Sequence, residues 1–202
     1  MNCFVSVQKA NGSSSRQKGF TLIELVIVVA ILGILAAIIA RAFGGGATSG
    51  ATASALYESA NKLSQNWSLL AQQAGTSTIV SGSTLVASGK TAADVLIGGS
   101  GNVAAGYLSA YNQSGIIPLS DLAQGSSGAY TISNFPVSIG GGGANPLSVI
   151  FTGVPDQIVL QLVQKHGSNV TTLAASDSTN TVIQYSVAGA GGTRTVTILK
   201  PI

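Results

Sequence analysis

The sequence predicts an α+β protein in which a long N-terminal helical region precedes a head built on an antiparallel sheet. Three observations lead to this fold class. An apolar run of helix length occupies residues 20–40, and an amphipathic helical pattern occupies residues 52–74. The remaining residues, 76–202, are rich in Gly, Ser and Thr and contain short apolar runs of strand length between turn residues.

The composition is that of an ordered protein with unusually few charges. Of the 202 residues, 46% are hydrophobic and only 7% are charged, against about 25% charged residues in an ordinary soluble domain. The formal net charge is +3, and no basic stripe favours nucleic-acid binding. Cys3 is the only cysteine and His166 the only histidine, so the sequence predicts no internal disulfide, no metal site and no cofactor.

The apolar run contains Glu24 as its only charge and Thr21 as its only other polar side chain. As a helix it would be about 32 Å long, which matches a hydrocarbon core of about 30 Å. Lys9, Arg16 and Lys18 precede it, so the positive-inside rule places the N-terminus in the cytoplasm. A carboxylate in such a segment costs about 2.5–3.5 kcal/mol on insertion scales, and Glu24 therefore requires an explanation.

A secretory signal peptide is one interpretation of this region. Residues 40–42 have an A-x-A-like pattern that a signal peptidase would cut. However, residues 25–40 form an unbroken apolar run of 16 residues, longer than the usual 7–15 of a signal peptide. This interpretation also leaves Glu24 unexplained.

Residues 18–24, with the sequence KGFTLIE, resemble the prepilin cleavage motif of type IV pilins and of the related type II secretion pseudopilins. The resemblance implies that prepilin peptidase recognises Lys18, cuts between Gly19 and Phe20, and N-methylates Phe20. It also implies that the Glu24 carboxylate attracts the new amino terminus of a neighbouring subunit. Opposite charges attract far more strongly in a low-dielectric core than in water.

On this resemblance the chain divides into four parts and adopts the pilin fold. The predicted parts are a leader (1–19), a transmembrane and filament-core helix (20–43), a glycine hinge with an amphipathic helix (44–75), and a globular head (76–202).

The glycine hinge consists of Gly44, Gly45 and Gly46, which we expect to be the flexible point of the helical region. Three consecutive glycines cost about 3 kcal/mol relative to alanine in a helix interior. The helix that follows, residues 52–74, carries one apolar stripe, and Gly75 stands where a C-terminal cap glycine belongs. The stripe consists of Leu56, Ala60, Leu63, Trp67, Leu70 and Ala74.

The head is predicted to contain short helices and several strands. Residues 91–97 and 155–165 favour helices, with His166 expected to be solvated or to cap the second of these. The predicted strands are residues 130–139 (interrupted at Pro136), 147–151, 181–187 and 193–199, the last two joined by a glycine-rich loop. The family's usual pair of cysteines near the C-terminus is absent.

No catalytic constellation is evident, because the single histidine and the acids Asp94, Asp121, Asp156 and Asp177 are scattered. The resemblance implies a structural subunit of a type IV pilus rather than an enzyme. Its partners would be further copies of itself, prepilin peptidase, the pilus assembly ATPase with its inner-membrane platform, and the membrane. The precursor would lie in the bacterial inner membrane and the mature protein in an extracellular filament. The alternatives are a pseudopilin and a Sec-secreted, adhesin-like protein.

Overall fold

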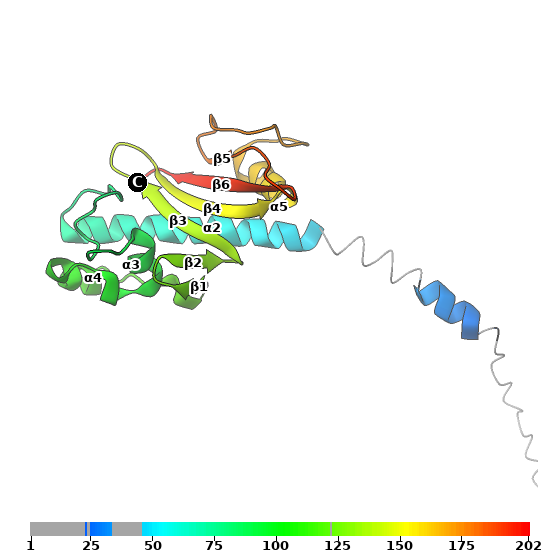
Figure 1. Cartoon of the computed structure of the whole chain (residues 1–202), viewed down its shortest axis with the longest axis horizontal. Helices are drawn as coiled ribbons and strands as arrows, with labels where there is room; N and C mark the ends of the chain where they lie inside the picture. The colour runs from blue at the N-terminus through cyan, green and yellow to red at the C-terminus, as the bar shows by residue number, and fades with distance from the viewer. Residues whose placement is uncertain (1–22, 24, 34–45, 122) are drawn as a thin grey trace, which may run out of the picture. The chain divides into compact units, whose positions relative to one another are not determined.

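The computed structural model describes residues 23, 25–33, 46–121 and 123–202 (Figure 1). The chain divides into two compact units, Met1–Ala42 and Phe43–Ile202. In the first unit, residues 25–33 are helical. Within the described stretches, no helix combines the length and the apolar character needed to cross a membrane.

The second unit begins with helix α2, Gly46–Ala74, which confirms the predicted amphipathic helix and starts six residues before it. Five members of the predicted stripe are completely buried, and Ala74 is partly buried. The helix ends at Gly75, whose φ of +64° is left-handed. Gly75 N–H donates to Gln72 O, and Thr76 N–H donates to Ala71 O. This pair of bonds is the Schellman motif, so the predicted glycine cap is confirmed.

A six-stranded sheet with strand order β1-β2-β3-β4-β6-β5 forms the rest of the framework, and every neighbouring pair is antiparallel (Figure 1). The predicted α+β class is therefore confirmed, with a long helix packed on an antiparallel sheet. The strands are β1 (Ala123–Ser126), β2 (Ala129–Ile132), β3 (Phe135–Gly141), β4 (Leu147–Pro155), β5 (Ile183–Tyr185) and β6 (Thr193–Lys200).

The single strand predicted over residues 130–139 is wrong, because β2 and β3 are two strands of a hairpin. The chain reverses at Ser133 and Asn134, whose φ values are +52° and +68°. Two consecutive positive φ values are typical of the tight turn that suits the twist of paired strands, and Asn tolerates them better than most residues. Pro136 does not interrupt a strand; it lies within β3 opposite Thr131.

Short helices complete the head. They are α3 (Ala92–Gly98), α4 (Leu108–Gln113) and α5 (Asp156–Leu162), with 3-10 turns at Ser100–Asn102, Ala105–Tyr107 and Leu119–Asp121. A π-helical turn, η4 (Val163–Gly167), extends α5. The predicted helices over 91–97 and 155–165 are confirmed in position. In α3, Thr91 and Asp94 form a capping box, which satisfies backbone donors at both residues.

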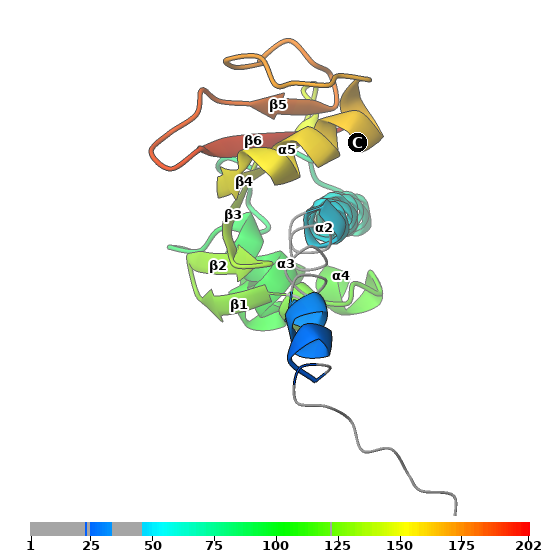
Figure 2. The same ribbon diagram turned by 90° about the vertical axis from the view of Figure 1, so that its right-hand side faces the viewer.

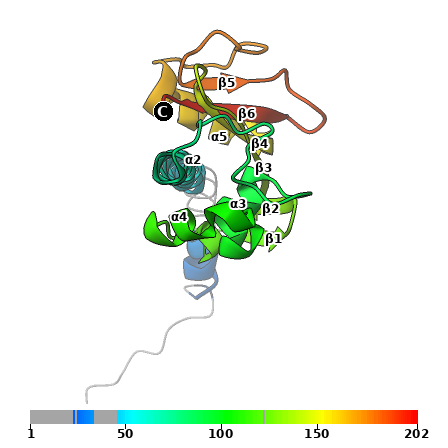
Figure 3. The ribbon, with the colours of Figure 1, turned by 90° about the vertical axis from the view of Figure 1, so that its left-hand side faces the viewer.

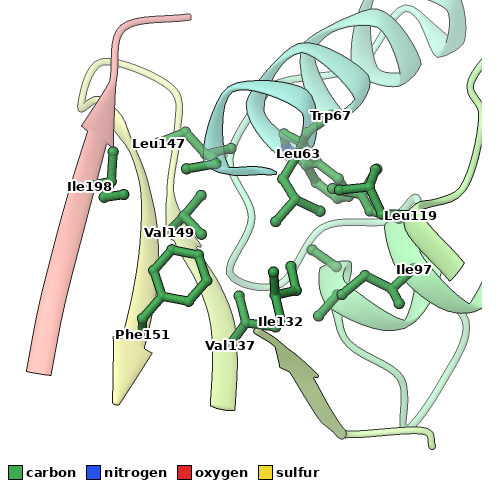
Figure 4. Packing of buried hydrophobic residues seen from close by; sticks show 14 of the residues in the cluster. Leu63, Trp67, Ile97, Leu119, Ile132, Val137, Leu147, Val149, Phe151 and Ile198 are labelled. Carbon is green, nitrogen blue, oxygen red and sulfur yellow. The ribbon is translucent and has the colours of Figure 1, made fainter. Parts of the chain in front are cut away.

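Helix α2 is the element around which the head is built. It lies between α5 on one side and α3 and α4 on the other, and it also contacts β4 and β6 (Figures 2 and 3). Leu63 and Trp67 point from α2 into a core formed with side chains of the sheet, such as Leu147 and Phe151 (Figure 4). Trp67 Nε1 donates to Thr78 O at 2.7 Å, so this large side chain is both buried and satisfied.

Candidate assembly site

The helical stretch of the first unit is apolar on all sides and is uncovered in the single chain. Residues 25–33 have the sequence LVIVVAILG, without a polar side chain. Its large side chains, with Ile23, leave 48–68% of their surface exposed. A helix that is apolar all round is stable only when lipid or other protein covers it. This stretch therefore requires a membrane or further subunits around it.

The residues predicted to direct cleavage, methylation and subunit pairing lie outside the described part of the chain. These are Lys18, Gly19, Phe20 and Glu24, so their roles stay predictions. Of the predicted flexible glycines, Gly44 and Gly45 also lie outside it. Gly46 is the first residue of α2.

The first turns of α2 are tied to the head by Lys165 of η4. Its Nζ donates to Gly50 O at 3.2 Å and to Ser54 Oγ at 3.0 Å. A Cβ at Gly50 would stand 3.8 Å from the Lys165 Nζ, an ordinary van der Waals distance, so the contact does not require glycine there. The N-terminal end of α2 is thus fixed to the head's own C-terminal half.

One turn further along α2, the Tyr57 ring lies between the imidazole of His166 and the ammonium group of Lys200. The His166 ring stacks on it with centroids 3.6 Å apart and planes at 3°. Lys200 Nζ stands 3.5 Å from the same ring centroid. Since His166 occupies one face of the ring, Lys200 must occupy the other. His166 is therefore neither freely solvated nor a helix cap, which corrects the sequence-based expectation.

This environment shifts the titration of His166. Burial lowers the pKa of its imidazole below 6.5, and repulsion from Lys200 and Lys165 lowers it further, while Glu58 opposes the shift. Neutral imidazole therefore suits the stack better than imidazolium.

A second buried cation, Arg194, holds the loop between η4 and β5. Its Nε donates to Asp156 Oδ1 at 2.7 Å, and its Nη1 donates to the carbonyl oxygens of Ala174, Ala175 and Ser186. Only 7% of Arg194 is exposed. A buried guanidinium with this many acceptors is well satisfied, and it joins the loop before β5 to α5 and β6.

Arg194 and Lys200 are not singled out from the sequence as buried cations, although the alternating pattern of the last strand indicates that both point inward. Along β6 the residues alternate between half-buried and buried, with Val196 and Ile198 buried. The same period of two places Arg194 and Lys200 on the inward face at either end of the strand.

Asp94 ties the β1–β2 turn to α3 on the other side of the head. Its carboxylate accepts hydrogen bonds from Thr91 N, Thr91 Oγ1 and Gly128 N. Burial would raise the pKa of Asp94, but these bonds and one from Ser127 outweigh it, so the pKa falls below its ordinary value. The acid is structural, and nowhere in the described ranges do three or more His, Cys, Asp or Glu residues gather as metal ligands.

Comparison with known protein families identifies the N-terminal segment. Residues 14–40 match the family described as the prokaryotic N-terminal methylation motif. This chain carries an N-terminal methylation motif. The motif constitutes a class III signal peptide, which is typical of type IV pilins and pseudopilins. No curated protein and no solved structure matches the chain.

The methylation motif and the fold together have three consequences. They indicate a type IV pilin-like or pseudopilin subunit, which is a structural protein and not an enzyme. The motif implies processing by prepilin peptidase and an assembly machinery. It also implies a precursor in the inner membrane that is then assembled at the surface or in the periplasm.

Proposed function

We propose that this protein is the structural subunit of a type IV pilus and polymerises through its apolar N-terminal helix into an extracellular filament. The observation that carries the proposal is the methylation motif at residues 14–40, which overlaps a helical stretch with uncovered apolar side chains. The head buries its own core, so it does not need this stretch in order to fold.

In the proposed mechanism, prepilin peptidase removes residues 1–19 and methylates Phe20. The subunit then waits in the inner membrane until the assembly ATPase and its platform move the apolar helix from lipid into the filament core. Because apolar side chains are covered in both places, the hydrophobic effect distinguishes them weakly. Close packing and the attraction between Glu24 and the neighbouring Phe20 amine supply the preference for the filament.

The Glu24 pair also explains register. A buried charge without its partner costs about 3–5 kcal/mol, so a subunit that enters the filament one turn too high or too low is strongly disfavoured. The proposed pairing therefore sets the axial position of each subunit as well as its affinity.

The first test is mass spectrometry of the mature N-terminus. The proposal predicts a chain that begins at Phe20 and is heavier by one methyl group. A chain that begins at Phe43 would contradict it and favour an ordinary secretory signal. The second test is electron microscopy of filaments sheared from cells. Long filaments composed of this chain support a pilus, whereas short assemblies confined to the periplasm would favour a pseudopilin.

A further inference from the structure

A cavity of about 520 Å³ lies beside the Tyr57 stack, where α2 meets the β3–β4 loop and the end of β6. All of its lining residues belong to the second unit, Phe43–Ile202. Its lining residues are Tyr57, Gly143, Ala144, Asn145, Pro146, Thr181, Val182, Leu199, Lys200, Pro201 and Ile202.

Lys200 lines this cavity, and no residue in the described ranges accepts a hydrogen bond from its ammonium group. Only 9% of Lys200 is exposed, and its single contact of note is the Tyr57 ring. Among the described residues the one ion pair is Arg194–Asp156, so no carboxylate reaches Lys200. An ammonium carries three donors, and the Lys200 nitrogen is not fully buried, so those donors are open to the cavity.

Lys200 differs in this respect from the other buried cation of the head. Arg194 has an acid and three carbonyl oxygens as acceptors, which satisfy its charge within the chain. Lys200 faces an aromatic ring and open space. The ring gives about 0.5–2 kcal/mol of cation–π attraction but accepts no conventional hydrogen bond.

Tyr57 holds the ammonium in position. His166 stacks on the opposite face of the ring, so the ring cannot turn away without breaking that contact. Tyr57 and Lys200 therefore present a fixed positive charge at the wall of the cavity. A preformed charge of this kind reduces the ordering cost of binding.

The rest of the cavity suits a ligand with an acidic group and a short apolar part. Asn145 and Thr181 are exposed lining residues that offer side-chain N–H and O–H donors. Pro146, Val182 and Pro201 give the wall its apolar surface. One ammonium balances one negative charge, so a singly charged carboxylate suits the site better than a doubly charged phosphate.

We propose that this cavity binds a carboxylate group, with its oxygens on Lys200 and its apolar carbon atoms against the proline-lined wall. The carboxylate comes either from a small organic acid or from an Asp or Glu side chain of a second copy of this chain. All residues of the site lie in the second unit, Phe43–Ile202, and the proposal does not depend on the proposed pilus function.

The neighbouring histidine reports on the occupancy of the site. Four groups from three elements face His166: Tyr57 and Glu58 from α2, Lys165 from its own turn, and Lys200 from β6. Lys200 and Lys165 repel its protonated form. A bound carboxylate offsets the Lys200 charge, so the pKa of His166 rises when the site is filled.

The test titrates the full-length chain in detergent micelles with butyrate and follows the His166 ring and backbone amides by NMR. Butylammonium, which has the same number of carbon atoms and the opposite charge, is the control ligand. We expect saturable shifts around residues 143–146 and 199–202 with butyrate only, and a raised His166 pKa at saturation. Absence of saturable shifts, together with no cross-link at Lys200 in the assay below, overturns the proposal.

Two variants test the site, so that the proposal stays testable even if one of them does not fold. Lys200→Met should weaken butyrate binding by about tenfold or more, which corresponds to about 1.4 kcal/mol, whereas Lys62→Met on the exposed face of α2 should bind as the parent does. Ala144→Trp fills the cavity from its exposed rim and should weaken binding even if Lys200→Met does not fold. Unchanged affinity in folded Lys200→Met, or in Ala144→Trp, contradicts the assignment.

A water-soluble carbodiimide distinguishes the two sources, because it joins an amine to a carboxylate that touches it. A cross-linked dimer with Lys200 joined to an Asp or Glu of the other copy identifies a second subunit as the ligand. Butyrate binding without such a cross-link identifies a small organic acid.

Discussion

The two helical regions of this chain contain similar apolar side chains in opposite situations. Residues 25–33 expose about half of every large side chain, whereas Leu56, Leu63 and Leu70 of α2 expose none. The difference lies in distribution: α2 confines its apolar residues to one stripe that the head covers, while the N-terminal stretch is apolar on every side. Side chains of one kind therefore stabilise folding in one region and require association in the other.

Glu24→Ala is expected to have the largest effect, because it should abolish association through the N-terminal stretch without changing the stability of the head. We expect filaments to disappear, because the amine of each incoming subunit loses its partner, while cleavage after Gly19 and the stability of the head stay unchanged. Electron microscopy, N-terminal mass spectrometry and urea unfolding measure the three properties. Abundant normal filaments from this variant would contradict the pairing, and Thr21→Ala is the matched control in the same segment.

The reverse experiment is Trp67→Ala in α2. Removing a fully buried tryptophan should lower the free energy of unfolding by about 3–5 kcal/mol. Leu69→Ala, on the exposed face of the same helix, should change it by less than about 0.5 kcal/mol. Urea titration followed by circular dichroism gives both values. Similar losses in the two variants would show that α2 does not have one stabilising face.

A smaller loss is expected from Arg194→Met, which leaves the carbonyl oxygens of Ala174, Ala175 and Ser186 without their donor. We expect about 1–3 kcal/mol of destabilisation and faster hydrogen exchange in residues 174–186. Asp156→Asn should cost less, since Asp156 is 42% exposed and the guanidinium keeps its carbonyl partners. If exchange increases uniformly over the head instead, Arg194 does not act on this loop in particular.

The smallest effect concerns pH. The folded pKa of His166 lies below its ordinary value of 6.5, so the unfolded chain binds the proton more readily. The contribution of His166 to stability is therefore complete above pH 6.5 and is lost as pH falls toward the folded pKa. In urea titrations between pH 5 and 8, the unfolding midpoint of the parent chain should decrease toward the acid side. The midpoint of His166→Gln should depend less on pH. A rise in stability on acidification would reverse this assignment.

The sequence was sufficient to predict those parts of the fold that depend on local periodicity. The stripe of α2, the glycine that ends it and the β5–β6 hairpin follow from spacing and from residue types with one strong preference. The turn at Ser133 and Asn134 was missed because Pro136 gave a stronger signal of interruption than a Ser-Asn pair does. Helix α4 shows no comparable stripe, with Tyr111 its only buried residue, so tertiary packing decides it.

The candidate sites divide in the same way. The residues of the methylation motif are contiguous, so they can be recognised in a linear sequence. Tyr57, His166 and Lys200 come from α2, η4 and β6, and only the folded head brings them together. Their identities give no hint of contact, although the alternation along β6 does indicate that Lys200 points inward.

The Arg194 contacts have a consequence for how the head matures. The loop that precedes β5 is closed by hydrogen bonds to a guanidinium, and the sole cysteine of the sequence is Cys3. Thiol oxidation therefore plays no part in forming the head, and reducing agents should leave its melting temperature unchanged. The head can thus reach its final structure without an oxidoreductase, whatever the redox poise of the compartment in which it folds.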